Sequence, residues 1–347
     1  MLTLLCFVIV LCVTITIHEF GHFIFAKKAG IYVYEFSIGM GPRLFKFKRK
    51  NDETDYSIRL FPIGGYVSMA GESIEADKNI PDDKQMFNKT WGQKISTVLA
   101  GVLFNFLLAI ILFFIVALSV GAPVNRNKIV DLEKNYPIEK TNIKVGDTIV
   151  KINGHNVRNQ DMLMLQLARY NGKTINITVK NKKNVVKTYK VSPKKIKENN
   201  QVSYRYGFAL TNERKHGIIE SIKYAFTKII DLITQMFFII LYLITGKLKL
   251  SSLSGPVGIY SIVGESAKAG LISVIYLIAY LCVNVGFINL IPLPAFDGGR
   301  AFILIFEKIT GKNVPPKIEN TIHSIGFVIL MLLMVLITYN DILRLIK

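Results

Sequence analysis

The chain has 347 residues, of which 51% are hydrophobic, and a formal net charge of +19. Its apolar residues are gathered into long uncharged stretches, which is typical of a protein that crosses a membrane several times and argues against a soluble enzyme. The basic residues flank those stretches or lie in one region outside them, so anionic lipid headgroups are a better counter-charge than nucleic acid. The three cysteines lie inside apolar stretches without a CxxC pair, which favours packing roles.

Four uncharged stretches are long enough to cross about 30 Å of hydrocarbon as helices. A further apolar stretch, residues 232–246, is shorter and is bracketed by Asp231 and Lys247, which favours an interfacial or re-entrant helix. The first stretch has no basic leading region and no small-residue cleavage site, so we expect a retained span rather than a signal peptide. The four expected spans are residues 1–17, 95–120, 269–296 and 320–340.

The segments between the spans predict two further structures. Residues 31–70 read as strand, polar turn and strand, with the turn in KRKNDET, and predict a β-hairpin packed at the membrane face. Residues 122–212 are rich in Lys and Asn and contain short alternating runs, which indicates an inserted soluble domain that is mostly β. We therefore expect a first membrane part over residues 1–121, this domain, and a second membrane part over residues 213–347.

The sequence HEFGH follows the first apolar stretch directly. His18 and His22 are four positions apart, so on a helix they share one face and can reach a single ion. The pattern H-E-x-x-H is that of zinc hydrolases, in which Glu19 would deprotonate a metal-bound water and later protonate the leaving amine. An ordinary polar helix face is the alternative. Three ionisable side chains at membrane depth are costly, however, and favour a compensating metal ion.

A catalytic zinc ion needs a third protein ligand, and Asp297 is the conspicuous candidate. It stands in NLIPLPAFDGG, after two prolines that interrupt the preceding helix and before two glycines that let the backbone pass closely. Asp297 can also cap the helix that follows, and the two roles are compatible. We expect one zinc site formed by His18, His22 and Asp297.

Both halves of this site must lie at one membrane depth. With the N-terminus outside the cell, residues 1–17 run inward, residues 95–120 return outward and residues 269–296 run inward again. This brings Asp297 level with the histidines only if residues 232–246 do not cross. The basic segments beside the spans then lie on the cytoplasmic side, as the positive-inside rule expects.

These residues resemble the site-2 protease family of intramembrane zinc metalloproteases, and within it the bacterial RseP and RasP group. The resemblance implies zinc bound by His18, His22 and Asp297, with Glu19 as catalytic acid and base. The implied fold is an α-helical polytopic membrane protein with four transmembrane helices, a membrane-associated β-hairpin and one inserted extracytoplasmic PDZ-like α+β domain. The matching segments are HEFGH (18–22), GGYVSM (64–69), FNKTWGQKISTVLAGVLFNF (87–106), SGPVGI (254–259) and NLIPLPAFDGG (289–299).

The resemblance also implies contacts with a substrate strand. Asn289 would help bind that strand, although a polar residue in a span also serves simple helix packing. Gly64 and Gly65 are also expected to contact the substrate, and an ordinary turn is the alternative role for these two glycines. The histidines outside the motif, His155, His216 and His323, receive no functional role. The expected substrate-binding residues are Asn289, Pro292, Pro294, Gly64, Gly65 and Tyr66.

By the same resemblance, the substrates are single-span proteins already trimmed by an upstream site-1-type protease, notably anti-sigma factors in regulated intramembrane proteolysis, and remnant signal peptides. The enzyme would lie in the bacterial plasma membrane, with both termini and the PDZ-like domain outside and the active site near the cytoplasmic side. That domain would bind peptide termini or exclude bulky substrates. A transporter or metal carrier is the rival class, but no inverted repeat relates the two halves. A catalytically silent scaffold is a third possibility.

Overall fold

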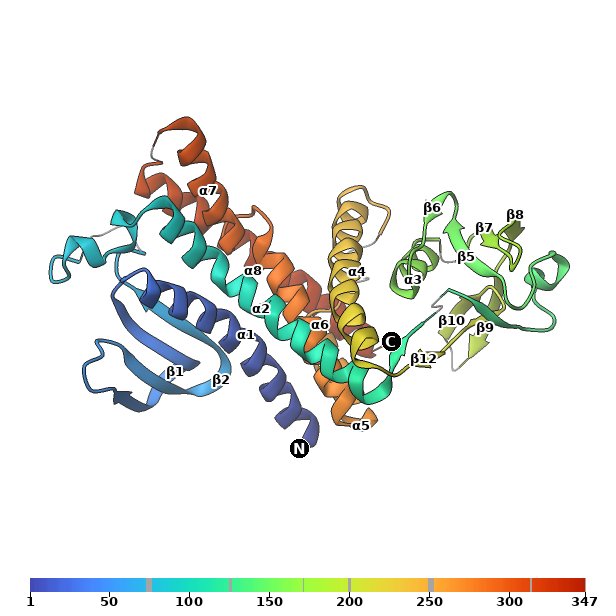
Figure 1. The fold of residues 1–347 in the computed structure, drawn as a ribbon, viewed down its shortest axis with the longest axis horizontal. Coiled ribbons are helices and arrows are strands. Elements are labelled where there is room, and N and C mark those ends of the chain that lie inside the picture. Colours follow the sequence, from blue (N-terminus) through green and yellow to red (C-terminus); the bar gives the residue numbers. More distant parts are fainter. Residues whose placement is uncertain are drawn as a thin grey trace. The chain divides into compact units, whose positions relative to one another are not determined.

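The apolar stretches fold into long helices (Figure 1). The computed structural model describes residues 1–72, 77–124, 127–170, 172–198, 201–248, 253–312 and 314–346. Among these residues, five helices are long and apolar enough to cross a membrane. Four of them correspond to the four predicted spans. The five are α1 (Leu2–Lys28), α2 (Trp91–Val120), α4 (Ile218–Ile244), α6 (Leu271–Leu290) and the segment Lys317–Leu343 of α8 (Pro316–Ile346).

The chain divides into two compact units, residues 1–113 with 250–347, and residues 114–249. The second unit contains α4, which the sequence grouped with the second membrane part. The helix α4 is also longer than predicted, because it includes residues 218–231 ahead of the expected stretch. Shortness therefore no longer argues against a membrane crossing by this helix.

One face of α4 packs on α3 (Gln160–Arg169). Nζ of Lys228 lies 2.6 Å from Oδ2 of Asp161 at the start of α3. Five residues further along α3, Nε2 of Gln166 donates a hydrogen bond of 2.9 Å to the hydroxyl of Tyr242. Polar contacts thus attach α4 to the inserted domain at Lys228 and at Tyr242, which are about four helical turns apart on α4.

The predicted hairpin forms two long bent strands, β1 (Val33–Lys48) and β2 (Asp55–Met69), joined through the predicted turn. Because both strands bend, Phe36 of β1 lies opposite Val67 on one side and opposite Tyr56 on the other. The pair therefore makes a sheet of four segments, and residues 65–69 form one of its edges. The order across this sheet is 65–69, 33–38, 55–58 and 43–48.

The core of the first unit lies between this sheet, the second half of α1 and the beginning of α2. Residues of all three are buried together, so the half of α1 that carries HEFGH is packed on both sides and held in one orientation. The buried members are Phe23, Ala26, Ala29, Ile31, Val33, Phe36, Val67, Met69, Met86, Val98 and Ala301.

The predicted 269–296 span ends earlier than expected. The short helix α5 (Pro256–Ala269) precedes α6, and α6 stops at Leu290 because the two prolines of NLIPLPAFDGG cannot continue its hydrogen bonds. The next helix, α7 (Asp297–Thr310), begins at Asp297 itself. The carboxylate therefore lies in a first helical turn, where the helix dipole favours negative charge.

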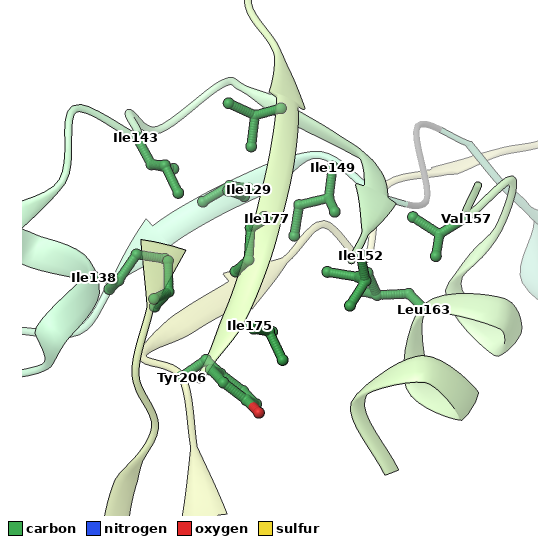
Figure 2. Close-up of a cluster of buried hydrophobic side chains, with 12 residues drawn as sticks. Ile129, Ile138, Ile143, Ile149, Ile152, Val157, Leu163, Ile175, Ile177 and Tyr206 are labelled. Atoms are coloured by element: carbon green, nitrogen blue, oxygen red, sulfur yellow. The ribbon is translucent and has the colours of Figure 1, made fainter. Parts of the chain in front are cut away.

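The second unit contains an α+β domain with a hydrophobic core of its own. Figure 2 shows this core, in which Ile129, Ile149, Ile152 and Ile177 from three strands meet Leu163 from α3. Strands β6, β5, β7 and β8 form a four-stranded sheet in that order. The described strands of the domain are β3 (Ala122–Pro123), β4 (Ile129–Leu132), β5 (Thr148–Ile152), β6 (His155–Asn156), β7 (Ile175–Lys180), β8 (Val186–Val191), β9 (Lys194–Glu198), β10 (Gln201–Arg205), β11 (Phe208–Leu210) and β12 (Arg214–Lys215).

Candidate metal centre

The two histidines of HEFGH and Asp297 lie together in the first unit. His18 and His22 project from one face of α1, and each is only 7% exposed. Their Nε2 atoms are 3.2 Å apart, and Oδ2 of Asp297 lies 3.0 Å from the first and 3.3 Å from the second. Two distant parts of the sequence therefore present three donor atoms to one point.

These distances fit a tetrahedral zinc ion. Zinc bonds of about 2.0–2.1 Å place neighbouring ligand atoms about 3.3–3.4 Å apart at the corners of a tetrahedron. The three donor pairs are 3.0–3.3 Å apart, close to that edge length. Oδ2 of Asp297 is also buried and accepts no hydrogen bond from the described residues. A buried carboxylate oxygen without a hydrogen-bond donor is costly unless a cation binds it, so the residues present fit zinc.

The second ring nitrogen of each histidine determines how the ring presents Nε2. Nδ1 of His22 lies 2.8 Å from the carbonyl oxygen of Thr97 in α2, and because that oxygen only accepts, Nδ1 carries the proton. Nδ1 of His18 lies 3.2 Å from the side-chain amide of Asn105, whose Oδ1 has no partner among the described residues. Rotating this amide by 180° turns its oxygen toward Nδ1 of His18. Both Nε2 atoms are then free to bind metal.

The helix α2 approaches the site very closely. A Cβ atom at Gly101 would lie 2.7 Å from Cε1 of His18, and a Cβ atom at Gly21 of α1 would lie 2.7 Å from the carbonyl carbon of Ala100. Any larger side chain at either position would push α1 and α2 apart. The small residues of the sequence LAGV in α2 therefore let the two helices enclose both imidazole rings.

Glu19 faces the same cavity as the three donor groups. The cavity has a volume of about 630 Å³ and is bordered by α1, β2, α2, α6, α7 and α8. Oε2 of Glu19 accepts a hydrogen bond of 3.2 Å from the backbone N–H of Val67, in the edge segment 65–69. Side chains of His18, His22 and Asp297 line the cavity as well, so a peptide that enters it contacts Glu19 and the donor atoms together.

The expected substrate residues on the α6 side occupy two different positions. Asn289, in the last turn of α6, lines the cavity. Pro292 and Pro294 lie in the loop between α6 and α7 and are outside the cavity lining; they shape the path of the chain toward Asp297. The structure therefore separates one residue that can reach a substrate directly from two that set the loop conformation.

The expected residues on the β2 side also differ from one another. Gly64 has a φ angle of +96°, which disfavours any side chain at that position of β2. Gly65 passes close to the catalytic candidate, because a Cβ atom there would lie 3.9 Å from Cγ of Glu19. The hydroxyl of Tyr66 instead donates a hydrogen bond of 2.7 Å to Oε2 of Glu35. Tyr66 thus anchors the edge segment within its own sheet.

Glu35 is the centre of a polar network in this sheet. Its carboxylate accepts hydrogen bonds from Ser57 and Tyr66 and lies 2.9 Å and 3.0 Å from the guanidinium groups of Arg59 and Arg43, respectively. Burial alone would raise the pKa of Glu35, but the hydrogen bonds from Ser57, Tyr66 and Arg59 outweigh it and lower the pKa to about 2. The network therefore holds a buried charge next to the edge segment.

Several residues of the site carry no expectation from the sequence analysis. Thr97 and Asn105 contact the histidine rings, and Val67 contacts Glu19. Arg300 and Glu72, which both line the cavity, form an ion pair of 2.6 Å. Only Asn105 had a visible signal, because an amide within an apolar span indicates a specific partner.

Comparison with known proteins places this site in a family. Residues 6–333 match the profile of peptidase family M50. The chain is 38% identical to a zinc metalloprotease by name from Clostridium acetobutylicum, over 95% of this chain and 94% of that protein. It is 37% identical to a protein of the same kind of name from Clostridium perfringens, over 94% of this chain and 95% of that protein. It is 31% identical to the zinc metalloprotease RasP of Shouchella clausii, over 99% of both chains.

Long apolar helices that enclose an HExxH segment and a distant carboxylate define a membrane-embedded metallopeptidase. The chain belongs to peptidase family M50, the site-2 proteases, as its sequence resemblance predicts. It is a zinc metalloprotease and a multi-pass membrane protein, and its substrate is a membrane protein within the bilayer.

Proposed function

We propose that this enzyme binds zinc through His18, His22 and Asp297 and cleaves the transmembrane segment of single-span membrane proteins. The observation that carries the proposal is the triangle of donor atoms, 3.0–3.3 Å apart, beside Glu19 in one cavity. A metal carrier would need the three ligands but has no use for a further carboxylate next to them. Proteolysis requires both.

Glu19 performs the proton transfers in this proposal. When bound, zinc polarises the scissile carbonyl group and lowers the pKa of a water molecule from about 15.7 to about 7. The Glu19 carboxylate, which shares the cavity with the three ligands, takes a proton from the attacking water and delivers it to the leaving amine. The ligands hold their positions through these transfers, because Thr97 and Asn105 fix the two imidazole rings.

The edge segment 65–69 provides a binding site for an extended substrate. A transmembrane helix must unwind before cleavage, because its carbonyl groups are bonded within the helix. The N–H of Val67 points toward Glu19 and away from β1, and alternate residues of a strand share that direction. Gly65 and Met69 therefore present their backbone groups on the same side. A substrate that adds as a further strand along this edge lies over Glu19.

Asn289 holds the same strand from the α6 side in this proposal, because it lines the same cavity as Val67 and Met69 of that edge. Pro292 and Pro294 support this contact indirectly through the loop conformation. Gly64 and Gly65 let the substrate backbone approach closely, and Tyr66 fixes the edge through Glu35.

The helix α4 lies outside the bilayer in the proposed topology. Its contacts with the inserted domain extend from Lys228 to Tyr242, and a soluble domain cannot follow a helix through hydrocarbon. With four crossings, α1 and α6 run in the same direction. The site then lies near the cytoplasmic side of the bacterial plasma membrane, with both termini and the PDZ-like domain outside.

The PDZ-like domain restricts access to the site by size in this proposal. Substrates are then single-span proteins that an upstream site-1-type protease has already trimmed, such as anti-sigma factors, and remnant signal peptides. Peptide binding is the alternative role, and a cavity of about 520 Å³ beside Met164 and Leu167 of α3 and Phe208 of β11 provides a place for it. Cleavage of a truncated but not a full-length reporter substrate supports exclusion by size.

The catalytic assignment is tested with purified full-length protein and a transmembrane reporter substrate. Glu19→Gln should retain zinc but lose cleavage by at least a factor of 100, because the proton acceptor is removed while the ligands remain. Asp297→Ala should lose zinc as well as cleavage. Retained turnover in Glu19→Gln would refute the assignment of the base, and zinc transport without peptide products would favour a carrier.

A further inference from the structure

The loop that precedes Asp297 is held from α8 by one side chain. Two of the six residues in loop 291–296 are prolines and have no N–H group. Three of the other N–H groups bond to carbonyl oxygens of α6 or of the loop itself. The N–H of Ala295 instead donates a hydrogen bond of 3.1 Å to Nδ1 of His323 in α8.

Ala295 needs such an external partner. Its φ angle is +75°, in the left-handed region that residues with a Cβ atom rarely adopt. Asp297 follows two positions later, so the same backbone turn directs its carboxylate toward the two histidines. Among the described residues, Nδ1 of His323 is the one acceptor of the Ala295 N–H.

The hydrogen bond also defines the state of the His323 ring. Nδ1 accepts a proton donor and is therefore unprotonated, so Nε2 carries the ring hydrogen. Nε2 is buried without a hydrogen-bond partner among the described residues, and the nearest carboxylate oxygen, on Glu319, lies 3.9 Å away. The loop is thus the ring's one hydrogen-bonding partner in the described chain.

A second contact of α8 supports the same loop. A Cβ atom at Gly326, one turn after His323, would lie 2.8 Å from the carbonyl carbon of Pro294. Most other side chains of α8 are exposed in this structure. The face of α8 that carries His323 and Gly326 is therefore packed on the loop.

We propose that His323 is a positioning residue of the metal centre: by accepting the N–H of Ala295, it holds loop 291–296 in the conformation that places Asp297 beside His18 and His22. This inference rests on the proposed role of Asp297 as a zinc ligand. It assigns to α8 a function that the sequence analysis left open, since His323 received no role there.

The test compares His323→Phe, which keeps the ring shape but has no acceptor, with His323→Asn, whose Oδ1 can take the place of Nδ1. Ser324→Ala, at the adjacent exposed position, is the matched control. Zinc release from the purified full-length enzyme to a chromogenic chelator is timed, and the absorption spectrum of the cobalt-substituted enzyme is recorded. Cleavage of a transmembrane reporter gives kcat and KM.

We expect His323→Phe to release zinc at least tenfold faster, with an altered cobalt spectrum and a lower kcat at unchanged KM, since residues that support a metal ligand contribute factors of 10–100 to metal affinity. His323→Asn and Ser324→Ala should behave like the wild type. A His323→Phe enzyme with wild-type zinc release and cobalt spectrum overturns the inference, as does a His323→Asn enzyme that fails like His323→Phe.

Two further variants separate the possible failures. Asp297→Ala must lose zinc, and the proposed metal site is wrong if this variant retains zinc. If Asp297→Ala loses zinc but His323→Phe releases it at the wild-type rate, only the role of His323 is rejected. Where His323→Phe does not fold, Gly326→Ala replaces it, because the added methyl group displaces Pro294 while His323 remains. Gly326→Ala should also accelerate zinc release, and wild-type release from this variant overturns the inference.

Discussion

Asn105 lies 3.2 Å from Nδ1 of His18 and is itself fully buried. The amide of Asn105 and the carbonyl group of Thr97 therefore occupy equivalent positions behind the two imidazole rings. Because Nε2 can bind a metal only while Nδ1 carries the ring proton, these contacts in α2 decide whether α1 presents a zinc site.

Replacing Asn105 should weaken zinc binding. Asn105→Leu removes the acceptor for Nδ1 of His18 but keeps the branched shape and the number of side-chain heavy atoms, and we expect the zinc dissociation constant to rise about 10- to 100-fold. Asn105→Asp, which keeps an oxygen acceptor, should stay closer to the wild type. Competition with a chelator of known affinity measures both. The matched control is Asn284→Leu in α6, outside the cavity lining, and equal losses in both leucine variants would contradict the prediction.

Removing one backbone donor should impair cleavage without loss of the fold. Val67→Pro deletes an N–H that points away from β1, a position where an edge strand tolerates proline. This N–H donates to Oε2 of Glu19, so its loss both releases the catalytic carboxylate and removes a donor from the edge. The loss of one hydrogen bond of about 1.4 kcal/mol corresponds to roughly tenfold lower kcat/KM, with zinc content unchanged. Val67→Ala controls for the side chain. If Val67→Pro cleaves the reporter at the rate of Val67→Ala, the substrate does not bind along this edge.

Stability should depend on pH through Glu35. Its pKa in the folded protein, about 2, lies below the ordinary value of 4.5, so the network contributes stability that is fully present above about pH 4.5 and is lost as the pH falls through about 2. Glu35→Gln should lower the unfolding free energy by roughly 2–3 kcal/mol at neutral pH.

Thermal unfolding in detergent, scanned from about pH 7 to pH 2, measures this difference. The gap between Glu35→Gln and the wild type should shrink as the pH falls below about 4.5. Asp83→Asn, at an exposed carboxylate, serves as the control and should show no comparable gap at any pH. A gap for Glu35→Gln that stays constant down to about pH 2 would mean that the carboxylate charge is not the source of the stability.

Both ends of α4 should be accessible from outside the cell. Single cysteines at Lys223 and Lys247, exposed residues near its two ends, should react with a membrane-impermeant thiol reagent added to intact cells in which the native cysteines have been replaced. A cysteine at Asn51, in the turn between β1 and β2, should react only after the membrane is opened. Labelling of just one end of α4 would show that this helix crosses the bilayer.

The long helices and the ligand set follow from local properties of the chain. The apolar stretches predict α1, α2, α6 and α8, since the length needed to cross hydrocarbon is a simple function of rise per residue. The length of α4 was not predicted, because one face of its first turns is buried by α3, a contact between segments distant in sequence. The pairing of residues 33–38 with two different parts of β2 is equally non-local.

The sequence by itself determined the two residues that share a helix face and the carboxylate that can join them, because a helix repeats every 3.6 residues and burying charge in lipid is costly wherever it occurs. Only the tertiary structure decided which groups support these three residues. Thr97 and Asn105 contact the histidine rings, and His323 accepts a hydrogen bond from Ala295, two residues before Asp297. Those hydrogen bonds depend on distance and direction between segments far apart in the chain, and no local pattern of residues encodes either.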